Sequence, residues 1–229
     1  MHDTRTNALL ASLPAEDREA VLSRSTLVQF GVNDDIGLPN TEVAYCYFGV
    51  EGVISGVAEM ADGRSAETHM VGYEGVTNPT AAFVPISGFS HLTGQSRGSA
   101  LRIEASALRQ LVQERPALRD ALASYAGGFQ RELEQTAGCH ALHRSDHRLA
   151  KWLLRYHDRW GKDRLDLTQE YLAAMLGSQR TTVNEALGRL ADTGALTVGR
   201  GRVVIADRAA LQAAACECYA QLAPLPLRA

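Results

Sequence analysis

A stretch that begins at Arg180 interleaves hydrogen-bonding side chains with apolar ones. Its apolar members recur every three or four residues and are Val183, Ala186, Leu187 and Leu190. In a helix these would share one buried face, so the polar members must point outward. The outward residues are Arg180, Thr181, Asn184, Glu185 and Arg189.

These outward side chains match the hydrogen-bonding groups on DNA base edges. An arginine such as Arg180 offers two donors to guanine O6 and N7, and Asn184 can pair with adenine N6 and N7. Glu185 can accept from cytosine N4. Thr181 and Thr182 offer hydroxyls to phosphate and methyl groups to thymine, and the positive helix N-terminus adds amides for the phosphate backbone. The pattern therefore predicts a helix that reads DNA.

A second, shorter helix must hold this one in place. Thr168 is a suitable N-cap, and Leu172, Met175 and Leu176 form one apolar stripe before Gly177 ends the helix. We include Thr168 and Gln169, at the start of this helix, among the residues that contact DNA. Two helices around a glycine turn predict a helix-turn-helix.

A basic hairpin follows at residues 195–205. Glycines in Gly199-Arg200-Gly201-Arg202 permit a tight turn, and we expect Arg200 and Arg202 to extend toward phosphate or the minor groove. The alternative is a helical pair that only packs a core, with Arg180 and Arg189 as ordinary solvated charges. The ordered combination of glycine turn, polar face and basic hairpin favours a winged helix-turn-helix.

The overall composition is that of a globular chain large enough for two domains. It has 229 residues, of which 45% are hydrophobic and 21% charged, with a formal net charge of -3. Divided after Gly138, the first part carries a charge of -7 and the remainder +4, so the basic excess accompanies the helix-turn-helix. No run approaches the roughly 20 apolar residues of a membrane span, and the start lacks a signal-peptide pattern. We expect a cytoplasmic protein without membrane partners.

The region before the helix-turn-helix is rich in predicted strands. Residues 7–22 suggest a short helix interrupted by Pro14. From Thr26 to Ile103, short apolar runs alternate with turns, and Asp62-Gly63 is a strong hairpin signal. The runs are LVQF, VAYCYF, GVISGVAEM, ETHMVGY, AAFVPI, HLTGQ and ALRI. This alternation of short apolar runs and turns predicts a compact all-β barrel or roll.

A long amphipathic helix is expected over residues 105–138, interrupted at Pro116. Its apolar stripe consists of Leu118, Leu122, Tyr125, Phe129 and Leu133. Gly127-Gly128 weakens a helix by about 1 kcal/mol per glycine unless another backbone approaches closely there. We expect the stripe to form a twofold dimer interface, because a dimer presents two recognition helices to one duplex. The alternative is that it packs only on the chain's own β-roll.

The remaining helices and the cysteines carry weaker signals. We expect a helix over 144–159, a closing helix over 207–221 and a proline-containing tail, with His143, His147 and His157 as caps or surface residues. The cysteines are Cys46, Cys139, Cys216 and Cys218, spaced like neither a disulfide framework nor a zinc site. On one helix Cys216 and Cys218 would lie on different faces, so we interpret all four as reduced thiols.

The order of these parts resembles the Crp/Fnr family of bacterial transcription regulators. The strongest stretch is LTQEYLAAMLGSQRTTVNEALGRLADTGALTVGRGRVVI at 167–205, and VEGVISGVAEMADGRSAETHMVGYEGV at 50–76 looks like the family's sensory roll. The resemblance implies an α+β fold with an N-terminal β-roll similar to cyclic-nucleotide-binding jelly rolls (1–104), a long dimerisation helix (105–138) and a C-terminal winged helix-turn-helix (139–229). It also implies homodimers that bind near-palindromic double-stranded DNA and contact RNA polymerase, with no enzymatic activity.

The cyclic-nucleotide cassette of that family is only partly matched. Glu74-Gly75 resembles its ribose-binding pair, but its cationic phosphate position falls on Gly88-Phe89. Bringing an anionic phosphate into a partly dry pocket without a paired charge costs several kcal/mol. We therefore expect a degenerate pocket at Glu74, Gly75, Gly88 and Phe89 that does not bind cyclic AMP in the usual way. Arg97, on a neighbouring predicted strand, is the one alternative cation for the phosphate, and we do not expect it to reach the pocket.

No cofactor is expected. The family's iron-sulfur members carry an N-terminal cysteine cluster, whereas this sensory part contains only Cys46. Haem would need an axial ligand from His69, His91 or Cys46. Two other functions stay open, namely a β-barrel metalloprotein, and a regulator that acts through protein contacts without DNA.

Overall fold

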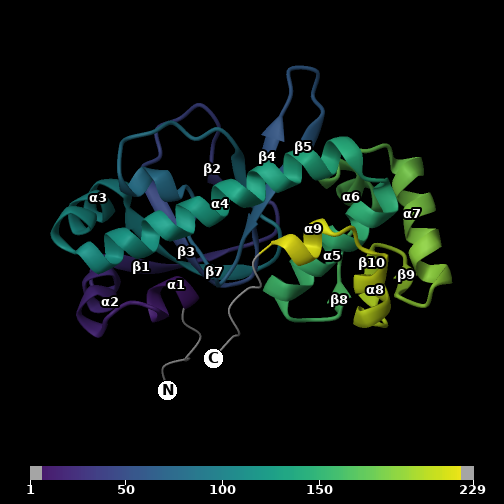
Figure 1. Cartoon of the computed structure of the whole chain (residues 1–229). Helices are drawn as coiled ribbons and strands as arrows, with labels where there is room; N and C mark the ends of the chain where they lie inside the picture. The colour runs from purple at the N-terminus through teal and green to yellow at the C-terminus, as the bar shows by residue number, and fades with distance from the viewer. Residues whose placement is uncertain (1–6, 223–229) are drawn as a thin grey trace. The chain divides into compact units, whose positions relative to one another are not determined.

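The computed structural model describes residues 7–222, which form two compact units (Figure 1). Within these residues, the first unit comprises 7–56 and 70–131, and the second comprises 57–69 and 132–222. Our expectations for the N-terminal start and the proline-containing tail fall at 1–6 and 223–229, outside the described residues. None of the helices between residues 7 and 222 is both long and apolar enough to cross a membrane.

The sheets have the antiparallel organisation of a roll. A three-stranded sheet has the order β1 (Ser25–Phe30), β7 (Gly98–Glu104), β3 (Tyr45–Glu51). A four-stranded sheet has the order β2 (Asp35–Gly37), β6 (His91–Gly94), β4 (Ile54–Glu59), β5 (Ser65–Val71). The expected hairpin joins β4 to β5, and Gly63 has a φ of 82° in its turn. The mixed fold with an N-terminal β-roll is confirmed.

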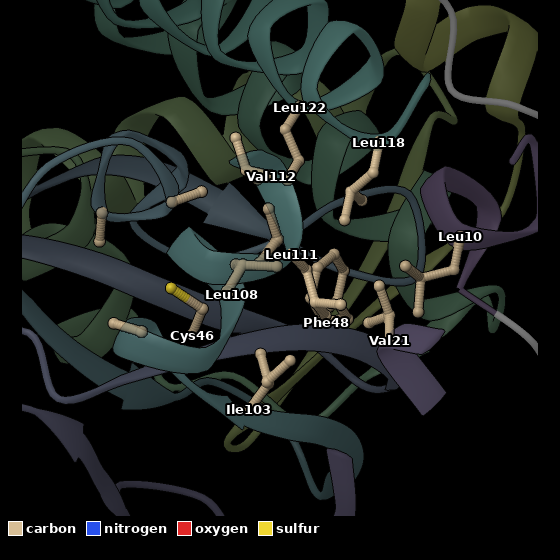
Figure 2. Close-up of a cluster of buried hydrophobic side chains, with 14 of the residues drawn as sticks. Leu10, Val21, Cys46, Phe48, Ile103, Leu108, Leu111, Val112, Leu118 and Leu122 are labelled. Atoms are coloured by element: carbon tan, nitrogen blue, oxygen red, sulfur yellow. The ribbon is translucent and has the colours of Figure 1, made fainter. Parts of the chain in front are cut away.

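Short helices pack against the three-stranded sheet to form the main core of the first unit. They are α1 (Ala8–Ala11), α2 (Ala15–Leu22), which begins after Pro14 as expected, and α3 (Ala105–Glu114). Figure 2 shows Leu108 and Leu111 of α3 pointing toward Phe48 of β3. Because each of these side chains is almost fully buried, this cluster contributes much of the apolar burial that stabilises the roll.

One expected strand is wrong. A 3-10 helix, η1 (Pro79–Ala82), contains the first two residues of the apolar run at 81–86. Asn78 adopts a left-handed conformation with a φ of 48°, and Pro79 has no amide proton for a sheet ladder. Ala81 and Ala82 are apolar because they pack in the core, not because they alternate across a sheet.

The long helix α4 (Pro116–Leu142) extends four residues beyond its expected end. Its first two stripe residues, Leu118 and Leu122, are buried in the core of the first unit (Figure 2). Tyr125 and Phe129 pack partly against the core of the same unit, and Leu133 is half-buried. The alternative of packing on the chain's own roll therefore accounts for Leu118 and Leu122.

The second unit is built around α5 (Ser145–Trp160), close to its expected bounds. The two helices of the helix-turn-helix are α6 (Gln169–Met175) and α7 (Arg180–Asp192). The unit also contains a three-stranded sheet with the order β8 (Arg164–Leu165), which precedes α6, then β10 (Arg202–Ile205) and β9 (Leu196–Gly199).

The expected closing helix over 207–221 is wrong in its middle. It is two helices, α8 (Arg208–Ala214) and α9 (Cys218–Gln221). Ala215 has an extended conformation with a ψ of 153°, so the chain changes direction there. Cys216 and Cys218 are therefore not on opposite faces of one helix, and their thiols are not separated as we expected.

A buried charge cluster connects α4 to α5 in the second unit. The Glu132 carboxylate accepts a hydrogen bond of 2.6 Å from Arg155 Nη2, and Arg159 Nη2 lies 3.6 Å from the same oxygen. Burial would raise the pKa of Glu132, but Arg159 and Arg155 outweigh it and hold that pKa below its usual value. Glu132 is thus ionised, and the two helices are joined by compensated charges.

Candidate nucleic-acid interface

Helix α6 begins and ends as the sequence predicts. The Thr168 hydroxyl accepts a hydrogen bond of 3.1 Å from the backbone N–H of Tyr171, which satisfies one amide of the first turn. Leu172, Met175 and Leu176 are buried. Gly177 follows with a φ of 56°, a left-handed conformation that ends the helix.

Helix α7 separates its two faces cleanly. Val183, Ala186, Leu187 and Leu190 are buried beneath it. Five polar side chains are exposed on its other side, and Thr182 is half-buried. The exposed residues are Arg180, Thr181, Asn184, Glu185 and Arg189. The structure thus places these five predicted base-reading residues on one solvent-facing helix surface.

The start of α7 is suited to an anion. Its N-cap residue, Gln179, makes no side-chain capping hydrogen bond, and the first turn contains no acidic residue. The first amides of a helix have no partner within the helix, and the helix dipole makes this end positive. A DNA phosphate is an acceptor of the right charge for these amides.

Arg189 differs from the other exposed residues because an ion pair ties it to another helix. Its Nε lies 2.9 Å from Asp146 Oδ2 of α5, and Arg144 Nη2 lies 3.0 Å from the same oxygen. Burial would raise the pKa of Asp146, but the His147 amide and Arg189 lower it below its usual value. The ionised Asp146 therefore positions Arg189.

Two contributors to this interface escaped the sequence analysis. The sequence does not indicate a role for Asp146 in this interface, because its partner Arg189 is 43 residues away in the chain. Arg148 of α5 donates a hydrogen bond to the carbonyl oxygen of Leu176, at the end of α6. Both side chains fix the turn and the recognition helix on α5, and only the tertiary fold brings them there.

The basic hairpin forms the expected wing. Strands β9 and β10 pair with Arg202 opposite Gly199, and Gly201 has a φ of 68° in the turn. Arg200 and Arg202 are both exposed. Gln169, in the first turn of α6, is half-buried. The second unit thus presents cations from its wing and hydrogen-bonding groups from α7.

Of the expected effector residues, Gly88 lines a small cavity to which Glu74, Gly75 and Phe89 do not contribute. Glu74 is buried, and its Oε1 accepts a hydrogen bond of 3.2 Å from the Gly72 amide. A Cβ atom built on Gly75 would lie 1.9 Å from the Tyr125 hydroxyl, so the side chain of Tyr125 fills the space above that glycine. Gly88 lines a cavity of about 110 Å³, whereas Phe89 is 76% exposed.

Two candidate haem ligands of the roll make other polar contacts, and the third is buried as a thiol in the core. His91 Nε2 lies 2.7 Å from Asp35 Oδ1. Burial of Cys46 in the core raises the pKa of its thiol to about 12. His69 is buried, and its Nδ1 lies 2.9 Å from the Thr68 hydroxyl.

Comparison with known proteins assigns part of the chain to a domain family. Residues 147–214 match the model of the Crp-like helix-turn-helix domain. A comparison of the sequence with curated proteins returned no match.

Solved structures share the fold. The c-di-GMP responsive global regulator CLP of Xanthomonas campestris superposes with a TM-score of 0.70 at 18% identity, over 85% of this chain and 100% of its own. FixK2 from Bradyrhizobium japonicum has a TM-score of 0.70 at 19% identity, covering 84% and 98%. TTHA1359, a Crp/Fnr transcriptional regulator from Thermus thermophilus, has a TM-score of 0.66 at 22% identity, covering 86% and 100%. Residues 147–214 are thus a Crp-like helix-turn-helix domain, and the chain has the fold of the Crp/Fnr transcription regulators.

Proposed function

We propose that this protein is a homodimeric transcription regulator that binds double-stranded DNA with sequence specificity. The observation that carries the proposal is the exposed face of α7, where Arg180, Asn184 and Glu185 lie opposite a fully buried apolar face. Arg180, Asn184 and Glu185 are exposed, and Glu185 lies 3.9 Å from Arg189 on the same helix, so all three side chains are accessible to a duplex. They have the donors and acceptors that discriminate base pairs in the major groove.

Phosphate contacts would set the register of the helix on the duplex. The open N-terminus of α7, with Thr181 and Thr182, supplies donors for the backbone on one side of the groove. We assign Thr168 and Gln169 to the neighbouring phosphates. Arg200 and Arg202 of the wing supply charge that does not depend on sequence.

Dimerisation would use the exposed side of α4. A Cβ atom added to Gly127 or Gly128 would meet no other atom of the described chain within 4 Å, so this side of the helix is open. Gly128 is three residues from Tyr125 and so lies on the same side of the helix, where its missing side chain lets a second backbone approach closely. Because Leu118 and Leu122 are buried in their own protomer, the proposed contact involves Tyr125, Phe129 and Leu133 beside this glycine.

We further propose that the roll does not bind cyclic AMP in the usual way. The cavity beside Gly88 measures about 110 Å³, whereas small-molecule sites usually span roughly 300–1,000 Å³. The fold is shared with a c-di-GMP responsive regulator. A cyclic dinucleotide is larger still, so neither nucleotide fits the cavity beside Gly88, and the Tyr125 side chain fills the space above Gly75. RNA polymerase, at near-palindromic promoter sites, is the second proposed partner.

Selection of bound duplexes from a random pool tests this function. The full-length protein should enrich a near-palindromic site whose halves are about one helical turn, or 10 base pairs, apart. Selection in the presence of cell extract would show whether an effector changes the outcome. Recovery of a random pool would contradict sequence-specific binding and favour a regulator that acts through protein contacts.

A further inference from the structure

Four soft metal ligands meet in the second unit. Cys139 lies on α4 and His143 directly follows its last residue, whereas Cys216 precedes α9 and Cys218 is the first residue of that helix. The ligand atoms of all four lie within 4.8 Å of one another. Three of the four residues are buried, and His143 is half-buried. The three thiols are therefore enclosed by the packed interior of the unit, and His143 is the partly exposed member of the group.

Two separations within the group are close to those around a single tetrahedral ion. Cys139 Sγ and Cys216 Sγ are 3.6 Å apart, and Cys218 Sγ is 3.4 Å from His143 Nδ1. Zinc binds thiolate sulfur at about 2.3 Å and imidazole nitrogen at about 2.0 Å, so neighbouring ligands of one zinc ion lie roughly 3.5–3.8 Å apart. A cluster of several iron atoms would hold its thiolates further from one another. The spacing thus favours a mononuclear site.

Other side chains already orient these ligands. His143 Nε2 lies 3.1 Å from the carboxylate of Glu217, so the ring directs its other nitrogen, Nδ1, into the group. Gln135 donates a hydrogen bond of 3.0 Å to Cys218 Sγ. A carboxylate behind a metal-bound histidine and a donor to a thiolate are the usual outer partners of metal ligands.

The backbone around Cys216 is held independently of its thiol. The Cys216 amide donates a hydrogen bond of 3.4 Å to the His147 carbonyl oxygen. His147 Nδ1 lies 2.9 Å from the Ala214 carbonyl oxygen. Contacts to α5 on both sides of Ala215 therefore keep the thiols next to α4 before any ion binds.

We propose that Cys139, His143, Cys216 and Cys218 bind one Zn²⁺ ion in a tetrahedral Cys₃His site. With four protein ligands the site is closed and structural. On binding, each of the three thiols that is protonated releases its proton to solvent, and His143 coordinates as a neutral imidazole. The ion would fasten the α8–α9 segment to the end of α4, in the unit that carries the recognition helix.

Metal content and cobalt substitution test the site directly. Full-length protein purified under reducing conditions should hold one zinc per chain. The protein stripped of metal should bind one Co²⁺ and show the intense visible bands of tetrahedral cobalt together with thiolate charge-transfer absorption. Cys216→Ser should lose the charge-transfer intensity and bind less tightly. Cys46→Ser is the matched control, because Cys46 is also buried but lies in the core of the first unit, and it should behave as the unaltered protein.

An outer-shell variant keeps the test independent of folding. Glu217 is exposed, so Glu217→Gln should leave the packing intact. It removes the carboxylate charge that interacts with His143 Nε2 and orients the ring. We expect zinc affinity to fall by about 10- to 100-fold, measured by competition with a chromogenic chelator. Removal of zinc should also lower the melting temperature of the unaltered protein and speed amide hydrogen exchange in 206–222.

Several results would overturn the proposal. Octahedral cobalt spectra, equal metal affinity in Cys216→Ser and the unaltered protein, or zinc well below one per chain would exclude the site. Stoichiometric iron and sulfide would assign these ligands to a cluster instead. A Cys139–Cys216 disulfide in protein prepared without oxygen would assign the pair to redox chemistry.

Discussion

The indole nitrogen of Trp152 on α5 donates a hydrogen bond of 2.7 Å to Glu67 Oε1 on β5. Both side chains are buried. The bond attaches the outer part of the β4–β5 hairpin to the helix on which the helix-turn-helix is assembled. A buried carboxylate needs such donors, because its transfer from water is costly when they are missing.

Trp152→Phe should therefore destabilise the second unit. The substitution keeps an aromatic ring beside Tyr156, whose centroid lies 5.5 Å away, but removes the N–H donor. We expect the free energy of unfolding to fall by about 1–3 kcal/mol in chemical denaturation. Trp160→Phe is the matched control, because that half-buried ring contacts Lys162, and it should cost clearly less. Equal losses in the two variants would show that the Glu67 bond contributes nothing particular.

The buried His69 should make stability depend on pH. Burial, with a smaller contribution from Arg159, outweighs the attraction of Glu132 and lowers the pKa of His69 from 6.5 to about 4. Below pH 6.5 the unfolded chain takes up a proton that the folded chain does not. Stability is thus complete above pH 6.5 and falls as the pH drops toward 4, by about 3 kcal/mol in total.

His69→Gln isolates this effect. Its free energy of unfolding should be nearly constant between pH 6.5 and 5, the part of the window above the usual carboxylate range, whereas that of the unaltered protein declines. Denaturation curves at several pH values measure both. Parallel declines would mean that other groups control this range.

Gly128 tests the dimer surface on α4, because it lies on the same side of the helix as Tyr125, whereas Gly127 lies on the other side from Phe129. The open side of Gly127 leaves room for a methyl group away from the interface, so Gly127→Ala should stabilise the helix by about 1 kcal/mol and leave the dimer intact. Gly128→Leu should separate the subunits, because the longer side chain prevents close approach of the partner helix. Analytical ultracentrifugation distinguishes the two, and a Gly128→Leu protein that remains dimeric would place the interface elsewhere.

Arg200 tests the wing. Its side chain is exposed beside Gly201 in the turn, where it can approach phosphate but reads no base. Arg200→Ala should weaken binding to specific and random duplex alike, and should reduce the slope of log affinity against log salt by about 1. Titrations at several salt concentrations measure that slope, and an unchanged slope would remove Arg200 from the phosphate contacts.

The local pattern predicted elements whose partners are near in sequence. Thr168, Gly177 and the apolar spacing of α7 define their helices through contacts within a few residues, so they are readable without the fold. The run at 81–86 was misread because burial of Ala81 and Ala82 gives the same apolar signature in a strand or a 3-10 turn.

Contacts between residues far apart in the sequence could not be predicted from the local pattern. Asp146 meets Arg189 only once α5 and α7 pack, and Cys139 meets Cys216 across 77 residues. One signal was overlooked: Cys139 and His143 are four residues apart in a helical stretch and hence on one face. The assumption of one unbroken closing helix concealed the rest, because an extended residue at Ala215 has no marker such as glycine or proline.

Binding of Arg180→Ala to a selected site and to a scrambled duplex tests the central claim that the outward face of α7 reads bases. The variant should lose about 1–3 kcal/mol, or roughly 5- to 150-fold in affinity, on the selected site and accept other bases at one position, while its affinity for the scrambled duplex changes little. Arg24→Ala, which removes an equal charge from an exposed residue just before β1, should leave both affinities unchanged. Equal losses for Arg180→Ala on both duplexes would contradict base reading by this helix.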